Sequence, residues 1–291
     1  MSINFITFDI LNRLLVHNLP RIPHDVDAVV GVPRSGLLLA NMISCCLNKP
    51  LTDVAGVVAG KFFDAGRTKN KTDWAHDFSA VKKILVVEDS VASGNSINQV
   101  KHRLALVNVE KIYLAAFVEP QAVNTVDLFF AVVPQPRMFE WNYMHHELLR
   151  LCCVDLDGVL CRDPTPEEND DGENYRKFLL NAAPKFIPSK PIGRIVTSRL
   201  KKYVEETQFW LRKNHIVCQK LTMLNMDSAE ERRRLNAHAP FKAQVYASIK
   251  ESPLFIESDP VQAREIAQLS GKDVFCVGNA VLFRGRQIPP K

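Results

Sequence analysis

Short apolar runs alternate with amphipathic segments along the first half of the chain. Strands are expected at 28–32, 83–87, 111–118 and 126–133, and helices at 37–47 and 96–107. Strands that alternate with helices are typical of a parallel sheet with helices on both faces. The pattern therefore predicts a doubly wound α/β fold for this half.

A second alternation of the same kind begins at residue 151. Strands are expected at 151–155, 193–197, 254–257 and 274–277, and helices at 203–214, 228–238, 243–250 and 260–270. Between the two halves, prolines, aromatic residues and two histidines interrupt the pattern. A chain of 291 residues fits two domains. We predict an α/β domain at 1–140, a junction at 141–150 and a second α/β domain at 151–291.

Composition narrows the class of protein without naming a function. Apolar residues make up 46% and charged residues 24% of the chain, as in ordinary globular proteins. No apolar stretch approaches the roughly 18 residues that span a bilayer, and the first residues do not resemble a secretory signal. We expect a cytoplasmic protein without a membrane partner.

The net charge of +5 suits anionic substrates such as phosphates. It does not exclude RNA or DNA, although no motif supports a nucleic-acid partner. The local cluster EERRR at 230–234 is expected to be a solvated helix face.

An acidic pair closes the strand expected at 83–87. Glu88 and Asp89 come directly after its apolar residues, and the loop 91–96 of small residues then opens a helix. Ligands of open α/β sheets bind at the carboxyl ends of strands, and helix N-termini favour anions. Carboxylates beside a phosphate cradle suit a sugar phosphate. An ordinary strand, acidic turn and helix would have the same order.

This order resembles the signature of type I phosphoribosyltransferases, which bind 5-phosphoribosyl 1-pyrophosphate (PRPP). The resemblance implies that Glu88 and Asp89 bind the ribose hydroxyls. It also implies a 5-phosphate site made of Ala92, Ser93, Gly94, Asn95 and Ser96.

The segment 31–36 reads GVPRSG between a strand and a helix. It resembles the pyrophosphate loop of the same family, which implies that Arg34, Ser35 and Gly36 face the pyrophosphate. Taken alone, it equally fits a turn with Ser35 as a helix cap.

The basic segment 60–71 corresponds to a mobile loop over PRPP in the family. The resemblance implies that Lys61, together with Arg67 and Lys69, neutralises the departing pyrophosphate. A solvated basic loop explains each of these residues equally well.

A second acidic motif ends the strand expected at 151–155, where the sequence reads LCCVDLDGVL. Asp155 and Asp157 are two residues apart, so both carboxylates leave the strand end on one side and can meet one Mg²⁺. A Ca²⁺ loop or a plain turn would show the same spacing.

The motif resembles the first motif of haloacid dehalogenase-like (HAD-like) phosphatases. The resemblance implies that Asp155 attacks phosphorus and Asp157 acts as general acid and base. It further implies that Thr197 and Ser198 bind the phosphoryl group and that Lys242 balances charge. Asp259, with Glu257 as the alternative, would complete the Mg²⁺ site of Asp155 and Asp157. The short insert after the first motif predicts a small cap.

The combined order resembles bacterial fusion proteins of a type I phosphoribosyltransferase domain and a HAD-like phosphatase domain. This resemblance implies a bifunctional, homo-oligomeric enzyme of nucleotide metabolism. It would transfer phosphoribose from PRPP, with Mg²⁺, to an unidentified nucleobase-like acceptor and then remove a phosphate. Two alternatives stay open. One is an effector of a stress or antiviral (phage) defence system that modifies nucleotides or nucleic acid, and the other is a non-catalytic sensor of PRPP or a nucleotide.

Overall fold

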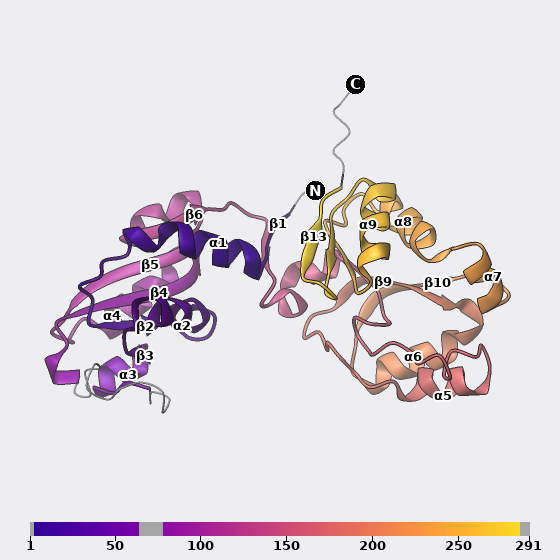
Figure 1. Cartoon of the computed structure of the whole chain (residues 1–291), viewed down its shortest axis with the longest axis horizontal. Helices are drawn as coiled ribbons and strands as arrows, with labels where there is room; N and C mark the ends of the chain where they lie inside the picture. Colours follow the sequence, from indigo (N-terminus) through magenta and orange to yellow (C-terminus); the bar gives the residue numbers. More distant parts are fainter. Residues whose placement is uncertain (1–2, 64–77, 286–291) are drawn as a thin grey trace, which may run out of the picture. The chain divides into compact units, whose positions relative to one another are not determined.

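The computed structural model describes residues 3–63 and 78–285, which form two compact units (Figure 1). One unit is Phe8–Arg137, and the other combines residues 3–7 with residues 138–285. The chain therefore divides near the predicted boundary at 140, but residues 3–7 group with the second unit. Each unit is described by itself.

The first unit contains a five-stranded, wholly parallel sheet of order β3-β2-β4-β5-β6. Its strands are β2 (Ala28–Gly31), β3 (Leu51–Asp53), β4 (Lys83–Val91), β5 (Glu110–Val118) and β6 (Leu128–Val132). The four predicted strands are confirmed, whereas the three-residue β3 was too short to predict. β4 runs four residues beyond its predicted end, so Glu88 and Asp89 lie inside the strand.

Helices α1 (Phe8–Asn18), α2 (Gly36–Leu47), α3 (Val54–Ala59) and α4 (Asn95–Arg103) complete the first unit. The chain leaves β2 toward β3 on one side, and β4 then pairs on the other side of β2. Connections that diverge in this way leave a crevice at the carboxyl ends of the two central strands, where α/β proteins bind ligands. The segments after β2 and β4 flank this switch point.

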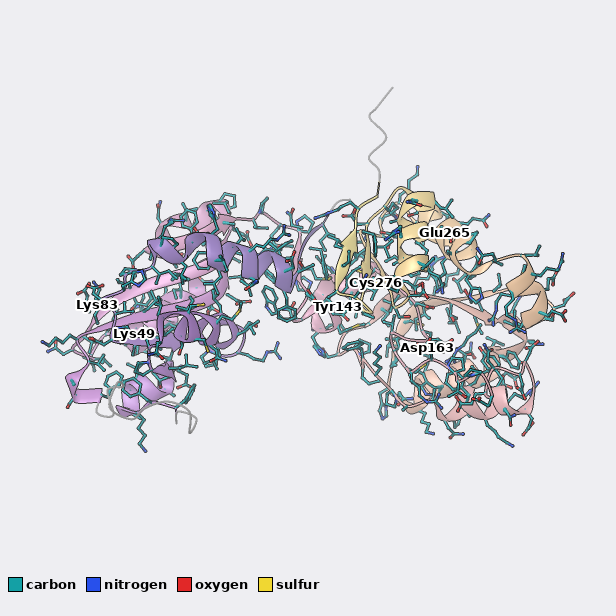
Figure 2. All side chains as sticks on the ribbon, in the orientation of Figure 1. Lys49, Lys83, Tyr143, Asp163, Glu265 and Cys276 are labelled. Carbon is teal, nitrogen blue, oxygen red and sulfur yellow. The ribbon has the colours of Figure 1, made fainter. Side chains whose placement is uncertain are left out.

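The two ends of β4 differ in chemistry. At the amino end, the Lys83 ammonium lies 2.9 Å from Asp25 and 3.1 Å from Glu110, close to solvent (Figure 2). At the carboxyl end, two acids are buried. Glu88 and Asp89 therefore lie in the crevice, at the opposite end of β4 from the surface ion pairs of Lys83.

The second unit contains a six-stranded sheet of order β10-β9-β8-β11-β12-β13. The strands are β8 (Cys153–Val154), β9 (Ile192–Leu200), β10 (Cys218–Leu224), β11 (Phe255–Glu257), β12 (Val274–Cys276) and β13 (Val281–Phe283). All pairs are parallel except β12 with β13, so the expectation of a wholly parallel sheet is wrong at this edge. The order places a second switch point between β8 and β11.

The helices of the second unit are α5 (Glu173–Asn181), α6 (Val204–Lys213), α7 (Ala229–Arg234), α8 (His238–Ser248) and α9 (Pro260–Ser270). α9 has its predicted bounds because Asp259 caps its start, proline follows, and Gly271 ends it at a φ of 69°. α8 begins five residues earlier than predicted, so Lys242 lies inside the helix and not at its start.

A small two-stranded sheet pairs β1 (Asn4–Ile6) with β7 (Arg137–Phe139). The ring of Phe5 lies 4.7 Å from that of Phe275 and 6.3 Å from that of Tyr143, both in the core of the second unit. In the described part of the chain, no helix has the length and apolar character needed to cross a membrane.

Candidate active sites

The acidic pair of the first unit lies at the switch point between β2 and β4. Glu88 and Asp89 are each only 7% exposed. The Glu88 carboxylate accepts hydrogen bonds from the Asp89 amide at 3.3 Å and from the Ser96 hydroxyl at 3.4 Å. Burial, together with the neighbouring Asp89 charge, raises the pKa of Glu88 to about 8. The pair therefore favours any ligand that compensates its charge.

The GVPRSG loop packs directly against this pair. The Val32 amide donates to the Val87 carbonyl at 2.9 Å. A Cβ atom on Gly36 would lie 2.6 Å from that carbonyl oxygen and 3.2 Å from the Glu88 carboxylate, so only glycine fits. Ser35 occupies the N-cap position of α2 without a capping hydrogen bond from its side chain, and Arg34 beside it is exposed.

The loop after β4 presents the residues expected to hold a phosphate. Ala92, Ser93, Asn95 and Ser96 are exposed, and α4 begins at Asn95. Gly94 is buried at a φ of 84°, and a Cβ atom there would lie 2.8 Å from the Thr125 methyl group. The Ser93 hydroxyl accepts from the Asn95 amide at 3.4 Å, and the Ser96 hydroxyl donates to Glu88. Amide groups at a helix start with exposed serine side chains beside them are typical of anion-binding loops.

Lys61 follows α3 and is exposed. Its carbonyl accepts a hydrogen bond from the Thr52 hydroxyl at 2.7 Å, which fixes the backbone and leaves the side chain in solvent. Arg67 and Lys69 lie outside the described residues.

Sequence reasoning missed a polar network beside the acidic pair. Glu119 follows β5 and accepts hydrogen bonds from Gln121 at 2.6 Å and Gln135 at 2.7 Å. The guanidinium of Arg137, 3% exposed, lies 3.7 Å from the Glu119 carboxylate. Burial lowers the pKa of Arg137, and the charges of Glu119 and Asp89 oppose this shift. An acid at the carboxyl end of a strand next to β4 was the available signal.

The fold and the site define an α/β domain with a parallel sheet and an anion cradle at its switch point. Residues 7–145 match the family model of the phosphoribosyl transferase domain. This part of the chain is therefore a phosphoribosyltransferase domain of type I, and the family binds PRPP as substrate. The match ends before the acidic motif of the second unit.

Two solved structures that are similar to this chain each match just under half of its length. The purine phosphoribosyltransferase of Pyrococcus horikoshii is 16% identical over 48% of this chain and 94% of its own, with a TM-score of 0.36. The xanthine-guanine-hypoxanthine phosphoribosyltransferase of Helicobacter pylori is 22% identical over 47% of this chain and 92% of its own, with a TM-score of 0.36. The search of curated proteins finds no match.

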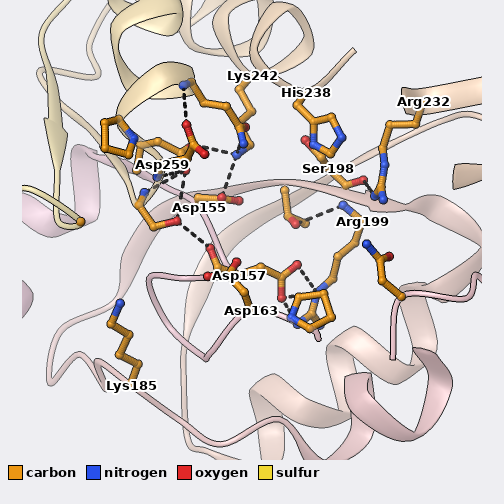
Figure 3. A pocket seen from close by; sticks show the side chains of 18 of the residues that line it. Asp155, Asp157, Asp163, Lys185, Ser198, Arg199, Arg232, His238, Lys242 and Asp259 are labelled. Carbon is orange, nitrogen blue, oxygen red and sulfur yellow. Dashed lines mark hydrogen bonds and ion pairs between the residues drawn. The ribbon is translucent and has the colours of Figure 1, made fainter. Parts of the chain in front are cut away.

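A cavity of about 520 Å³ lies at the switch point of the second unit (Figure 3). Its walls come from the carboxyl ends of β9 and β11, from the segments that follow β8 and β11, from helices α7, α8 and α9, and from the insert between β8 and β9. The structure brings all six of the expected residues of the second site to this cavity: Asp155, Asp157, Thr197, Ser198, Lys242 and Asp259.

Lys242 joins two buried carboxylates. Its ammonium lies 2.7 Å from Asp155 and 2.7 Å from Glu257, and it donates to Gln262 at 2.9 Å. Burial raises the pKa of Asp155 well above its usual value, although Lys242 opposes the shift. Burial alone would lower the pKa of Lys242, but Asp155 and Glu257 together raise it. Two carboxylates and one ammonium leave one negative charge uncompensated.

Asp157 has a different partner. The guanidinium of Arg199, which is 1% exposed, holds both oxygens of the Asp157 carboxylate at 2.6 to 3.2 Å. Sequence reasoning missed Arg199, although it directly follows Thr197 and Ser198. The two motif carboxylates therefore have different partners in this structure, Asp155 with Lys242 and Asp157 with Arg199, and their binding of one shared metal ion stays a prediction.

Three predicted residues remain: Thr197, Ser198 and Asp259. Two of them make local hydrogen bonds to backbone amides, and one does not. The Thr197 hydroxyl accepts from the Arg199 amide at 3.2 Å. The Asp259 carboxylate accepts from the Val261 and Gln262 amides at 2.8 Å, so it caps α9. By contrast, the Ser198 hydroxyl is buried and has no hydrogen-bond partner.

A magnesium ion fits these residues in part. Asp155 Oδ1 is buried without a hydrogen-bond partner, and the uncompensated charge beside it suits a cation. Asp157 and Asp259 have other partners. Within residues 3–63 and 78–285, no group of three His, Cys, Asp or Glu side chains is placed to hold a metal ion. A bound ion would therefore take much of its coordination from substrate and water.

The EERRR cluster is not wholly a solvated helix face. Arg232 on α7 is 6% exposed and lines the cavity, whereas its neighbours Arg233 and Arg234 are exposed. Helix α7 has only six residues, which is too short for the hydrophobic periodicity to predict that Arg232 is buried while Arg233 and Arg234 are exposed.

Proposed function

We propose that the first unit transfers phosphoribose from PRPP to a nucleobase-like acceptor with the help of Mg²⁺. One observation carries this proposal: Glu88 of the buried acidic pair lies against the GVPRSG loop, at Gly36, and accepts a hydrogen bond from Ser96 at the start of α4. A ribose with phosphate groups at both ends needs this arrangement, because its hydroxyls lie between its two anionic ends.

Each segment then has a role in the reaction. Glu88 and Asp89 accept hydrogen bonds from the ribose hydroxyls, residues 92–96 hold the 5-phosphate, and Arg34, Ser35, Gly36 and Lys61 face the pyrophosphate. An acceptor nitrogen bonds to C1 of the ribose as the bond from C1 to pyrophosphate breaks, and the proton of that nitrogen leaves to water or to the departing pyrophosphate. Mg²⁺ would neutralise charge on the departing pyrophosphate. The two acids would hold the ribose in place while positive charge develops near C1.

The deciding experiment measures pyrophosphate release from PRPP and Mg²⁺ across a panel of bases, nucleosides and RNA. Asp89→Asn keeps the shape but removes a charge, and we expect at least about a 100-fold loss of turnover, as for other preorganised electrostatic groups. Glu110→Gln, on an exposed residue of β5, is the matched control. Release stimulated by one acceptor identifies the acceptor class. PRPP binding without release by any acceptor contradicts the transferase proposal and favours a sensor.

For the second unit we propose a HAD-like phosphohydrolase with a small cap, acting on a phosphorylated product of the first reaction. The residue order and the cavity at a switch point support this proposal. An Asp155 oxygen would bond to phosphorus as the bond from phosphorus to the ester oxygen breaks, and the leaving oxygen would take a proton from Asp157 or from water. A water molecule would then attack the aspartyl phosphate and release inorganic phosphate. Lys242 would oppose the effect of burial and so favour the ionised form of Asp155 that attacks. Hydrolysis of p-nitrophenyl phosphate, absent in Asp155→Asn, tests this activity.

The pairing of Asp157 with Arg199 favours one alternative. A carboxylate held at two oxygens by a buried guanidinium is poorly placed to exchange a proton. The same cavity could therefore bind a phosphorylated ligand without turnover, as a sensor of a nucleotide or of PRPP. Phosphate binding together with absent hydrolysis of any phosphate ester would favour this sensor. Growth arrest on expression that requires Asp89 would favour a defence effector.

A further inference from the structure

Arg232 is a buried cation without a carboxylate partner among the described residues. Its Nη1 donates to the Ser198 carbonyl at 2.7 Å, and its Nε has no hydrogen-bond partner. The other two buried cations of the cavity differ, because Lys242 pairs with Asp155 and Glu257, and Arg199 pairs with Asp157. A buried charge without a counter-ion is unfavourable, so an anionic ligand would stabilise this position.

The groups around Arg232 point to the kind of anion. The Ser198 hydroxyl, also buried and without a partner, lies on the same wall of the cavity as Arg232 (Figure 3). The bond from Arg232 to the Ser198 carbonyl fixes these two donors relative to each other. Two fixed donors from different elements suit a group with several acceptor oxygens in different directions.

His238 completes this wall without adding charge. Burial, with the nearby charges of Arg232 and Lys242, lowers the pKa of His238 to about 4. The imidazole is therefore neutral near pH 7, and Arg232 supplies the positive charge of the wall. Among the described residues, Asp155 Oδ1 is a third buried polar atom that lines this cavity and has no hydrogen-bond partner. It is an acceptor, so it suits an electrophilic phosphorus or a cation.

We propose that Arg232 binds the phosphoryl oxygens of a phosphate monoester beside Ser198, and that Arg232 is the residue that makes this cavity selective for a dianionic phosphate. The assignment rests on the proposed phosphohydrolase and adds a residue that recognises its substrate. A carboxylate has two oxygens and one negative charge, whereas a phosphate monoester has three acceptor oxygens and up to two charges. A cavity of about 520 Å³ also has room for a sugar or nucleoside beyond the phosphate.

The test is calorimetric titration of the full chain with inorganic phosphate, ribose 5-phosphate and acetate, in the presence of Mg²⁺. Every variant also carries Ser93→Glu, which places a negative charge in the proposed 5-phosphate site of the first unit, so that the second cavity alone is measured. We expect Arg232→Gln to weaken both phosphate ligands roughly 10- to 100-fold, as for the loss of a hydrogen bond to a charged group. Arg233→Gln, on the exposed neighbour, is the matched control and should bind as the unaltered protein does. Acetate should bind weakly to every variant.

A structural role for Arg232 would show in a different readout. Arg232→Gln removes the bond to the Ser198 carbonyl, so its melting temperature is measured without ligand. If this variant does not fold, Ser198→Ala takes its place, since the Ser198 hydroxyl has no partner to lose. Ser198→Ala should weaken phosphate binding by about 5-fold or more and leave the melting temperature unchanged.

The outcomes separate the two proposals. Arg232-dependent phosphate binding without hydrolysis of any ester supports this inference and contradicts the phosphohydrolase. Ester hydrolysis with the same KM in Arg232→Gln contradicts this inference and supports the phosphohydrolase. Unaltered protein that binds neither phosphate ligand, or binds acetate equally well, overturns the inference. Ribose 5-phosphate binding more tightly than inorganic phosphate supports an ester as the natural ligand.

Discussion

Both units have acidic residues at the carboxyl ends of the central strands of a sheet. The units differ in how many of these carboxylates are paired with a buried cation. In the first unit, Glu88 and Asp89 lie at the end of β4, beside exposed loops that lead to solvent. In the second, Lys242 pairs with Asp155 and Glu257, and Arg199 pairs with Asp157, so cations of the fold offset part of the carboxylate charge inside the cavity. The repulsion within the first pair raises the pKa of Glu88 to about 8, whereas three carboxylates of the second cavity are paired with buried cations.

The substitution with the largest expected effect removes the ammonium group that Asp155 and Glu257 share. Lys242→Met leaves Asp155 and Glu257 buried without their shared cation, which should destabilise the second unit by about 3–5 kcal/mol. Urea denaturation followed by circular dichroism measures the loss. Lys250→Met, on an exposed residue after α8, should change stability by less than about 0.5 kcal/mol. Equal stability of the two variants would show that the ion cluster is not a structural requirement.

The close approach of the two loops in the first unit predicts the next effect. Gly36→Ala forces a Cβ atom against the Val87 carbonyl, and overpacking of this kind costs about 1–3 kcal/mol. Faster hydrogen exchange of the β2 and β4 amides would report it. In Gly172→Ala the nearest atom to the new Cβ lies 3.4 Å away, so the change should be tolerated. Normal exchange in Gly36→Ala would contradict the close packing.

The raised pKa of Glu88 predicts a dependence of PRPP binding on pH. Because the folded-state pKa rises from 4.5 to about 8, the protonated carboxyl stabilises the fold below about pH 4.5, and this contribution is lost as the pH rises through 8. A ligand that requires the ionised carboxylate should therefore release a proton near pH 7. Its affinity should rise by at most about tenfold per pH unit up to pH 8.

Calorimetry in two buffers with different ionisation enthalpies counts that proton. Glu88→Gln cannot ionise, so it should bind PRPP with Mg²⁺ weakly and without this proton release. The same proton count in the unaltered protein and in Glu88→Gln would assign the titration to another group.

The smallest effect separates two roles of Asp259. Asp259→Ala removes the cap of α9 and should lower stability by about 1 kcal/mol, whereas Asp259→Asn keeps a capping side chain. If Asp259 also binds a metal ion, Asp259→Asn will weaken Mg²⁺ binding while stability stays within about 0.5 kcal/mol. Unchanged Mg²⁺ binding in Asp259→Asn would leave Asp259 with the capping role alone.

Local pattern predicted the acidic motifs, four of the five strands of the first sheet and four of the six strands of the second, because apolar strands and the residues that end them are encoded within a few positions. It missed β10 and β13 and the small sheet of β1 and β7. The positions of the GVPRSG loop and of Lys242 followed from a family resemblance, and the structure brings both to the predicted carboxylates. Arg199 and Arg232 could not be predicted in the same way. Their partners are 42 and 34 residues away in sequence, and their type alone favours a solvent-exposed position.

The segment Pro120–Thr125 after β5 adds a mechanical consequence to the first site. Lys101 of α4 donates to the Thr125 carbonyl at 2.9 Å, and Gln121 donates to the Ala92 carbonyl at 3.4 Å. The loop after β4 and helix α4 are therefore hydrogen-bonded to the segment Pro120–Thr125 at two points. Between these points, Gly94 lies close to the Thr125 side chain. Because of these hydrogen bonds, we expect the two segments to move together. A ligand that binds near Glu119 should therefore also affect anion binding by the loop after β4.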